Sequence, residues 1–111
     1  MPVAIPVDVL TLELPVSRPK ANATEGTPVE SELVLFADGD TEFGVWEVTP
    51  GSFTSRKHGA CELMHFVAGG GTITGADGTV TDIAPGVAVF LPDGWEGTWE
   101  VTSTIRKSYA I

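Results

Sequence analysis

Residues 51–69 read Gly51-Ser-Phe-Thr-Ser-Arg56-Lys-His58-Gly-Ala-Cys61-Glu62-Leu-Met-His65-Phe-Val-Ala-Gly69, between the turn signals Pro50-Gly51 and Gly69-Gly70-Gly71. A polar, cation-bearing segment is followed by an apolar run that alternates with the period of two typical of a β-strand. If that strand is unbroken, His58, Glu62, Met64 and Phe66 project to one face. A carboxylate and an imidazole among apolar side chains predict a small-molecule pocket rather than a solvated surface.

Turn signals punctuate the chain on both sides of this stretch. They are Asp38-Gly39-Asp40, Ala76-Asp77-Gly78, Ala84-Pro85-Gly86 and Pro92-Asp93-Gly94. The segments between them are about 5–9 residues long and rich in Val, Ile, Thr, Phe and Trp, which is typical of hairpins in a sandwich or barrel. Asp77-Gly78 is the strongest hairpin signal. We find no window with helical periodicity, so the sequence predicts an all-β fold, a small antiparallel barrel or jelly roll.

The first part of the chain is less regular. Residues 7–14 contain β-branched and apolar residues with partial alternation, and Pro15 follows them, which predicts a short edge strand or a strand exchanged between subunits. Residues 17–27 are polar and predict a loop. We therefore expect an arm and loop over residues 1–30 and a single β-barrel domain over residues 31–111, with the last two strands at 95–102 and 105–111.

Composition limits the classes of partner and compartment. The 111 residues fit one domain, and 15 acidic against 6 basic residues give a formal charge of −9. This balance disfavours nucleic acid and anionic membranes, which require clustered lysine and arginine. The single cysteine, Cys61, excludes an intrachain disulfide and fits a reducing compartment. With no signal peptide or membrane span recognisable, we expect a cytoplasmic protein.

Two glycine-framed motifs resemble those of the cupin superfamily. Arg56-x-His58-x-x-x-Glu62, followed by six residues and Gly69, is similar to its His-x-His-x-x-x-Glu motif. In the second motif, Gly86 and Pro92-Asp-Gly94 lead to the third ligand position at Gly97. Residues 90–109 resemble the small single-domain cupins grouped with the cupin domain of (S)-ureidoglycine aminohydrolase. Over residues 44–111 the resemblance implies the cupin double-stranded β-helix, a jelly-roll barrel.

The resemblance also bears on a metal cofactor. In metal-binding cupins two histidines, the glutamate and a third histidine converge on one cation, and such ligands suit iron, manganese, nickel or zinc. Here His58 and Glu62 match ligand positions, whereas Arg56 and Gly97 do not. A guanidinium would repel a divalent cation. We therefore expect a metal-free site, and a divalent transition metal held by His58 and Glu62 is the alternative.

In a metal-free site, Arg56 would pair with Glu62 and His58 would lie beside them. Arg56 could bind an anionic or amide-bearing ligand through its donor fork, with Glu62 or His58 as general base. The structural alternative places Arg56 outward at a strand end and makes His58 a hydrogen-bonded wall residue. Cys61 and His65 have the opposite parity to Glu62, so we expect them on the other face.

Aromatic and late-strand residues complete the candidate site. The resemblance places Trp95 and Trp99 near the barrel mouth, where they would stack on a ligand, although core packing is the default for aromatic residues. Lys107 and Tyr109 share parity on the last strand and match the Lys-x-Tyr ending of the related small cupins. The resemblance implies that both approach the substrate, with Lys107 among the catalytic residues.

Three functions remain open at this point. The first is a C–N hydrolase or lyase acting on a ureido or amino-acid-like metabolite, as the resemblance implies. The second is a non-catalytic ligand-binding or sensor cupin, and the third is a dimerisation module with a vestigial pocket. Several strands alternate weakly, which indicates that both of their faces are covered, so we also expect a homodimer.

Overall fold

Two long strands, β6 (Glu62–Gly75) and β9 (Glu96–Ala110), pair along almost their whole length and form the spine of the fold. The computed structural model describes residues 2–111. Within them all strand pairs are antiparallel and no helix forms. The all-β prediction is therefore confirmed.

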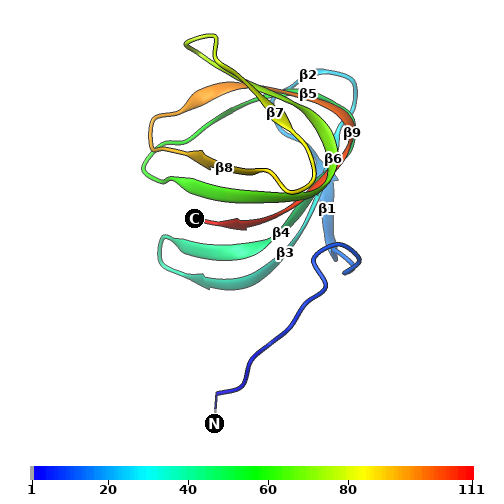
Figure 1. Cartoon of the computed structure of the whole chain (residues 1–111), viewed down its shortest axis with the longest axis vertical. Coiled ribbons are helices and arrows are strands. Elements are labelled where there is room, and N and C mark those ends of the chain that lie inside the picture. Colours follow the sequence, from blue (N-terminus) through cyan, green and yellow to red (C-terminus); the bar gives the residue numbers. More distant parts are fainter. Residues whose placement is uncertain (1) are drawn as a thin grey trace.

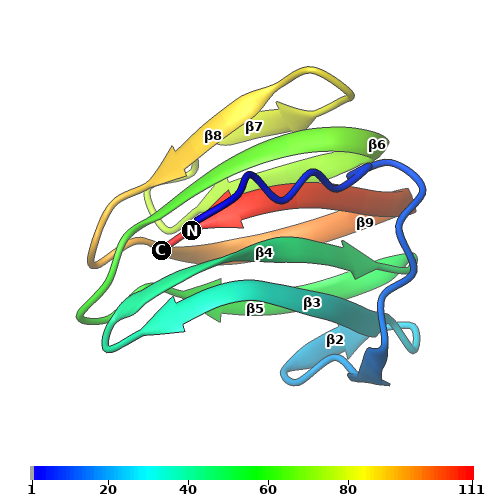
Figure 2. The same cartoon turned by 90° about the horizontal axis from the view of Figure 1, so that it is seen from below.

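The remaining strands curl around this spine into a barrel-like sheet (Figures 1 and 2). The C-terminal half of β9 pairs with β4 and its N-terminal half pairs with β5. The sheet continues from β4 through β3 to β1 and from β5 to β2, whereas β7 and β8 pair with β6. Their bounds are β1 (Val16–Pro19), β2 (Ala23–Glu25), β3 (Val29–Asp38), β4 (Thr41–Val48), β5 (Gly51–Arg56), β7 (Val80–Ile83) and β8 (Ala88–Leu91).

Glycines bend the spine where the sequence suggested a turn. Gly69 and Gly71 lie within β6 at shifts of its register with β9, at φ of 88° and 155°. A Cβ at Gly69 would lie 2.2 Å from the Thr104 carbonyl oxygen, and one at Gly71 would lie 2.1 Å from that of Glu100. Only glycine permits this approach of the two backbones. The strand therefore continues through 69–71, and the expected turn there is wrong, as is the division of β9 into two strands.

Aromatic side chains fill the interior of the curled sheet. Phe53 and Trp99 stack with ring centroids 5.5 Å apart, and Trp46 meets Trp99 edge-on at 5.8 Å. Phe66 lies 6.1 Å from Trp99, and Phe53 and Phe66 are almost completely buried. The core is thus centred on β4, β5, β6 and β9.

The N-terminal residues differ from the prediction. Residues 7–14 form no strand; instead the amides of Thr11 and Leu12 donate to the Asp8 carbonyl, and that of Leu10 donates to the Asp8 side chain. This local turn satisfies the backbone without a sheet neighbour, so the prediction of a strand is wrong. The segment before it leaves the body as an extended arm (Figure 1).

Two local features complete the fold. The Asp77-Gly78 hairpin is confirmed: it joins β6 to β7, with Gly78 at a φ of 86° and the Thr79 amide 2.9 Å from Asp77 Oδ1. In the part of the chain described, we find no helix long and apolar enough to cross a bilayer.

Candidate functional site

A glutamate held by two lysines lies inside the barrel. Glu62 begins β6, and the alternation of that strand turns it inward, leaving it 4% exposed. Lys107 of β9 is 5% exposed, and its Nζ lies 2.6 Å from Glu62 Oε2. Lys57, immediately after β5, donates to Glu62 Oε1. Both carboxylate oxygens of Glu62 therefore accept from an ammonium group, which is the pairing that a buried charge requires.

Lys107 is also surrounded by aromatic rings and a sulfur. Its Nζ lies 4.5 Å from the ring centroid of Trp46, 5.3 Å from that of Trp99 and 5.7 Å from that of Tyr109. The Met64 sulfur lies 3.1 Å from the same nitrogen. Cation–π attraction and the carboxylate together offset part of the cost of burying this ammonium.

Burial and pairing shift the pKa values of this pair. Burial raises the pKa of Glu62, but the charges and hydrogen bonds of Lys107 and Lys57 outweigh it and leave that pKa below its usual value. Burial lowers the pKa of Lys107, and the opposing effect of Glu62 does not fully restore it. Glu62 is therefore a carboxylate and a weak base, and Lys107 is an unusually acidic ammonium.

These shifts predict how acid unfolds the protein. Because the pKa of folded Glu62 lies below its ordinary value of 4.5, the unfolded chain binds a proton that the folded chain does not bind. The stabilisation from Glu62 is thus present above about pH 4.5 and is lost as pH falls through the folded pKa. Denaturant unfolding from pH 7 to pH 3 should show a smaller loss of stability in Glu62→Gln than in the wild type. The exposed control Glu100→Gln should keep the wild-type dependence, and an equal loss in all three proteins would contradict the prediction.

The cluster lies at a cavity of about 200 Å³. Within it Tyr109 donates to Glu42 Oε2 at 2.6 Å, and Trp46 Nε1 donates to Glu30 Oε1 at 2.9 Å. Burial, followed by Glu42, raises the pKa of Tyr109 above its usual range. The buried Nε1 of Trp99 has no acceptor among the described residues. The lining residues are Lys20, Glu30, Glu32, Glu42, Trp46, Phe53, Ser55, Lys57, Glu62, Trp99, Lys107, Tyr109 and Ile111.

The structure brings part of the predicted site together. Glu62, Lys107, Trp99 and Tyr109 all line the cavity. Met64 and Phe66 are fully buried on the inward face of β6, as the alternation predicted. The Met64 sulfur contacts the Lys107 ammonium, whereas Phe66 packs against the ring of Trp99.

His58 lies outside the cavity. Strand β5 ends at Arg56, and residues 57–61 form a loop before β6, so the alternation does not continue from His58 to Glu62. His58 is exposed in this loop. The expectation that His58 and Glu62 face inward together is therefore wrong.

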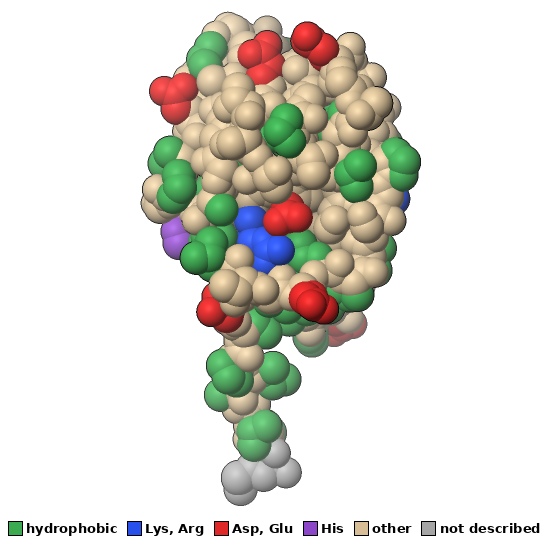
Figure 3. Space-filling model, turned by 90° about the vertical axis from the view of Figure 1, so that its right-hand side faces the viewer, with side chains coloured by type: hydrophobic (Ala, Val, Ile, Leu, Met, Phe, Trp, Pro, Cys, Tyr) green, Lys and Arg blue, Asp and Glu red, His purple; other side chains and the backbone are tan. Residues whose placement is uncertain are grey.

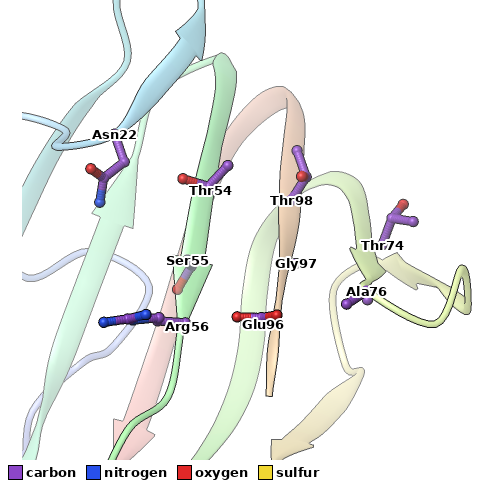
Figure 4. A pocket seen from close by; sticks show the side chains of 10 residues that line it. Asn22, Thr54, Ser55, Arg56, Thr74, Ala76, Glu96, Gly97 and Thr98 are labelled. Carbon is purple, nitrogen blue, oxygen red and sulfur yellow. The ribbon is translucent and has the colours of Figure 1, made fainter. Parts of the chain in front are cut away.

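Arg56 also points away from Glu62. Phe53 and Ser55 take the inward positions of β5, which leaves Arg56 outward, opposite Glu96 of β9. Figure 4 shows it in an open groove lined by Thr54, Ser55, Gly97 and Thr98, among others. That groove is larger, about 680 Å³, but it holds none of the buried charges of the barrel interior. Lys57, not Arg56, is the basic residue from this segment that pairs with Glu62. The prediction of an Arg56–Glu62 pair is therefore wrong.

Trp95 is likewise outside the cavity. It is half-buried immediately before β9, where it lines a different depression with Ile73, Val89 and Leu91. A Cβ at Gly97 would lie 2.7 Å from its ring and 2.2 Å from the carbonyl oxygen of Thr74. The ring of Trp95 therefore covers the position of the third cupin ligand.

The donor set does not fit a cupin metal. Of the four ligand positions, Arg56 and His58 are exposed, Gly97 has no side chain, and Glu62 is engaged by two ammonium groups. Across residues 2–111, no three His, Cys, Asp or Glu side chains are grouped so that they could hold a metal ion. We therefore derive no step through a metal.

Sequence reasoning missed several residues of the cavity. Glu30, Glu32 and Glu42 were not singled out, nor were Lys20 and Lys57. Glu30 and Glu32 alternate on β3, a signal that could have placed them on one face. Lys57 had no such signal, because it lies in a loop.

The geometry now defines a class of protein: a single curled jelly-roll sheet with its charged groups gathered inside. The family description "EutQ-like cupin domain" matches residues 35–109. The chain belongs to the EutQ-like cupin domain family. The resemblance to cupins is thus confirmed, whereas the relation to ureidoglycine aminohydrolase stays a prediction.

Solved structures support the same fold. A protein of unknown function of the DUF861 family from Pseudomonas syringae pv. tomato is 28% identical, with a TM-score of 0.77 over 94% of this chain and 46% of its own. EutQ from Clostridium difficile is 21% identical, with a TM-score of 0.65 over 75% of this chain and 67% of its own. A DUF861 family protein from Thermotoga maritima is 28% identical, with a TM-score of 0.55 over 59% and 73%. Curated proteins gave no match. This chain spans less than half the length of the Pseudomonas protein.

Proposed function

We propose that this cupin binds a small metabolite in the barrel cavity and that the metabolite carries both hydrogen-bond donors and acceptors, as a ureido or amino-acid-like compound does. The observation that carries the proposal is the buried Glu62 with its two lysines at a cavity walled by aromatic rings. Aromatic walls with a few convergent polar groups are typical of ligand sites. At roughly 30 Å³ per water molecule, 200 Å³ corresponds to about seven waters, which limits the ligand to a small molecule.

Unused hydrogen-bonding capacity supports this class of ligand. The three donors of the Lys57 ammonium are not all used by Glu62. A ligand oxygen satisfies such groups. Glu42, which also lines the cavity, accepts from Tyr109 and can accept again from a ligand N–H. A cavity lined by both donors and acceptors matches a compound that has both.

The second candidate function is C–N hydrolysis of such a compound, and the lowered pKa of buried Lys107 favours it. In this reaction water adds to the carbonyl carbon, the C–N bond breaks, and the departing nitrogen takes up a proton. Lys107 suits that proton transfer better than Glu62, whose lowered pKa makes it a weak base. Glu62 would then position Lys107. Since fold alone does not define a reaction, a non-catalytic sensor or a vestigial pocket is the outcome if no turnover is found.

Ligand-induced thermal stabilisation tests the binding site. A ureido and amino acid panel should contain a compound that raises Tm, because a ligand at 100 times its Kd adds about 2.7 kcal/mol. For a domain of this size this corresponds to roughly 10 °C. Lys57→Met should abolish the shift.

Arg56→Met is the matched control: it changes the preceding residue but faces the outer groove, so it should retain the shift. The opposite pattern, in which Arg56→Met abolishes the shift and Lys57→Met retains it, would place the ligand outside the barrel. A panel without any shift would remove the proposed ligand class. Turnover of the bound compound, measured as ammonia release, separates the enzyme from the sensor.

A further inference from the structure

All three lysines of the chain line the barrel cavity. They are Lys20, Lys57 and Lys107. Lysine is normally a surface residue, and a chain with 15 acidic residues offers many surface carboxylates that could pair with it. On the face of the molecule that Figure 3 shows, acidic side chains are spread over the surface. The lysines are gathered at one cavity instead, which indicates a role for their ammonium groups in the barrel interior.

Lys107 differs from the other two lysines in its burial. Its side chain is 6% exposed, whereas those of Lys20 and Lys57 are 17% and 20% exposed. Burial is the main cause that lowers the pKa of Lys107, and the positive charges of Lys57 and Lys20 lower it further, against the effect of Glu62. Desolvation and a neighbouring cation are the two features that activate a lysine amine as a nucleophile. Both act on Lys107.

The groups around the Lys107 nitrogen favour a product that keeps its positive charge. Glu62 Oε2 lies 2.6 Å from this nitrogen, and the ring centroids of Trp46 and Trp99 lie 4.5 and 5.3 Å away. Acylation of the amine would remove the charge and leave the buried Glu62 carboxylate paired with Lys57 alone, which costs stability. A protonated imine carries its charge on the same nitrogen, so the carboxylate and the aromatic rings stabilise it as they stabilise the ammonium.

We propose that Lys107 forms an imine with a small aldehyde or ketone bound in the cavity. The neutral amine adds to the carbonyl carbon, the carbinolamine loses water, and the nitrogen takes up a proton to become an iminium ion beside Glu62. The proton lost before the attack is thus regained, water is the only other product, and nothing is oxidised or reduced. The volume of about 200 Å³ limits the carbonyl compound to a few carbon atoms. This activity goes beyond the proposed binding of a ureido or amino-acid-like compound and does not require it.

Reductive trapping on the wild-type protein tests the proposal. Glyoxylate and glycolaldehyde are the probes, each with sodium cyanoborohydride at pH 7, which converts an imine into a stable secondary amine. Peptide mapping by mass spectrometry then gives the rate at each lysine. We expect at least one probe to label Lys107 about 10-fold faster than Lys20 and Lys57. Exposure alone predicts the reverse order, because non-specific trapping favours the two more exposed lysines.

Two controls connect this rate order to the folded site. In concentrated guanidinium chloride the three lysines should be labelled at similar rates, since unfolding removes their different surroundings. Lys107→Arg keeps a cation beside Glu62 but has no primary amine, so the fast labelling should disappear. The comparison of the three lysines within the wild type does not depend on how well this variant folds.

The outcomes separate imine formation from ligand binding. If neither probe labels Lys107 faster than both Lys20 and Lys57, the proposal is overturned. Thermal stabilisation by the ureido and amino acid panel can still be found in that case, because it measures non-covalent binding. Fast labelling of Lys107 together with a panel that gives no shift would support the imine and remove the ureido class of ligand.

Discussion

Lys107→Met is expected to lower the free energy of unfolding by about 3–5 kcal/mol, because it leaves the Glu62 carboxylate buried with one of its two cations gone. Methionine fills a similar volume among Trp46, Trp99 and Tyr109, so the loss reports the unpaired charge more than a cavity. Urea unfolding at pH 7 measures the change. Burial of the pair is the cause of the large effect.

A surface ion pair with similar geometry provides the control. Arg18 Nη2 lies 3.0 Å from Glu32 Oε1, but the Arg18 side chain is 46% exposed. Arg18→Met should therefore cost no more than about 1 kcal/mol. If Lys107→Met lowers the free energy of unfolding no more than Arg18→Met does, the buried Glu62–Lys107 pair does not stabilise the fold more than a surface ion pair.

The double variant separates pairing from packing. Glu62→Gln removes the charge that Lys107→Met leaves unpaired, while Lys57 is only partly buried and can turn toward water. We expect Glu62→Gln/Lys107→Met to be clearly more stable than the sum of the two single changes implies, with a coupling of about 2 kcal/mol. Additive losses would show that the two side chains do not act as a pair.

Sequence reasoning placed side chains correctly wherever a strand was regular. Period-two alternation is a property of the backbone, so the inward parity of Glu62, Met64 and Phe66, and of Lys107 and Tyr109, followed from spacing alone. The motif glycines that frame the strands were recognisable for the same reason. These local signals were sufficient to predict the all-β fold.

The same reasoning failed across a break in the strand. Counting parity from His58 to Glu62 assumed one continuous strand, and the loop at residues 57–61 removes that relation. Lys57 reaches Glu62 from this loop because of its position in three dimensions, which spacing does not encode. Residues 7–14 have strand-like composition, but a turn at Asp8 satisfies their backbone instead. The composition of residues 7–14 did not distinguish a strand from a turn.

Gly97→His should lower the free energy of unfolding by about 3 kcal/mol or more, although it restores the third residue of the cupin metal motif. The Cβ alone would lie 2.2 Å from the Thr74 carbonyl oxygen, and a backbone atom paired in the sheet cannot move aside as a side chain can. Gly39→Ala is the control: its φ is positive, at 59°, but the space around it is open, so this substitution should cost only about 1 kcal/mol.

Completing the motif should not create a metal site either. In Arg56→His/Gly97→His, the histidine at position 56 and the native His58 point to the outside, away from Glu62, whose oxygens remain bonded to Lys57 and Lys107. A metal that binds the folded state raises Tm, so Co²⁺ or Ni²⁺ should leave the Tm of this variant unchanged, and Co²⁺ should give no visible absorption of a tetrahedral complex. A stoichiometric Co²⁺ spectrum, or a Tm restored by metal, would show that the loop at 57–61 can turn His58 inward. Such a result would mean that Glu62 can bind a metal ion instead of pairing with Lys57 and Lys107.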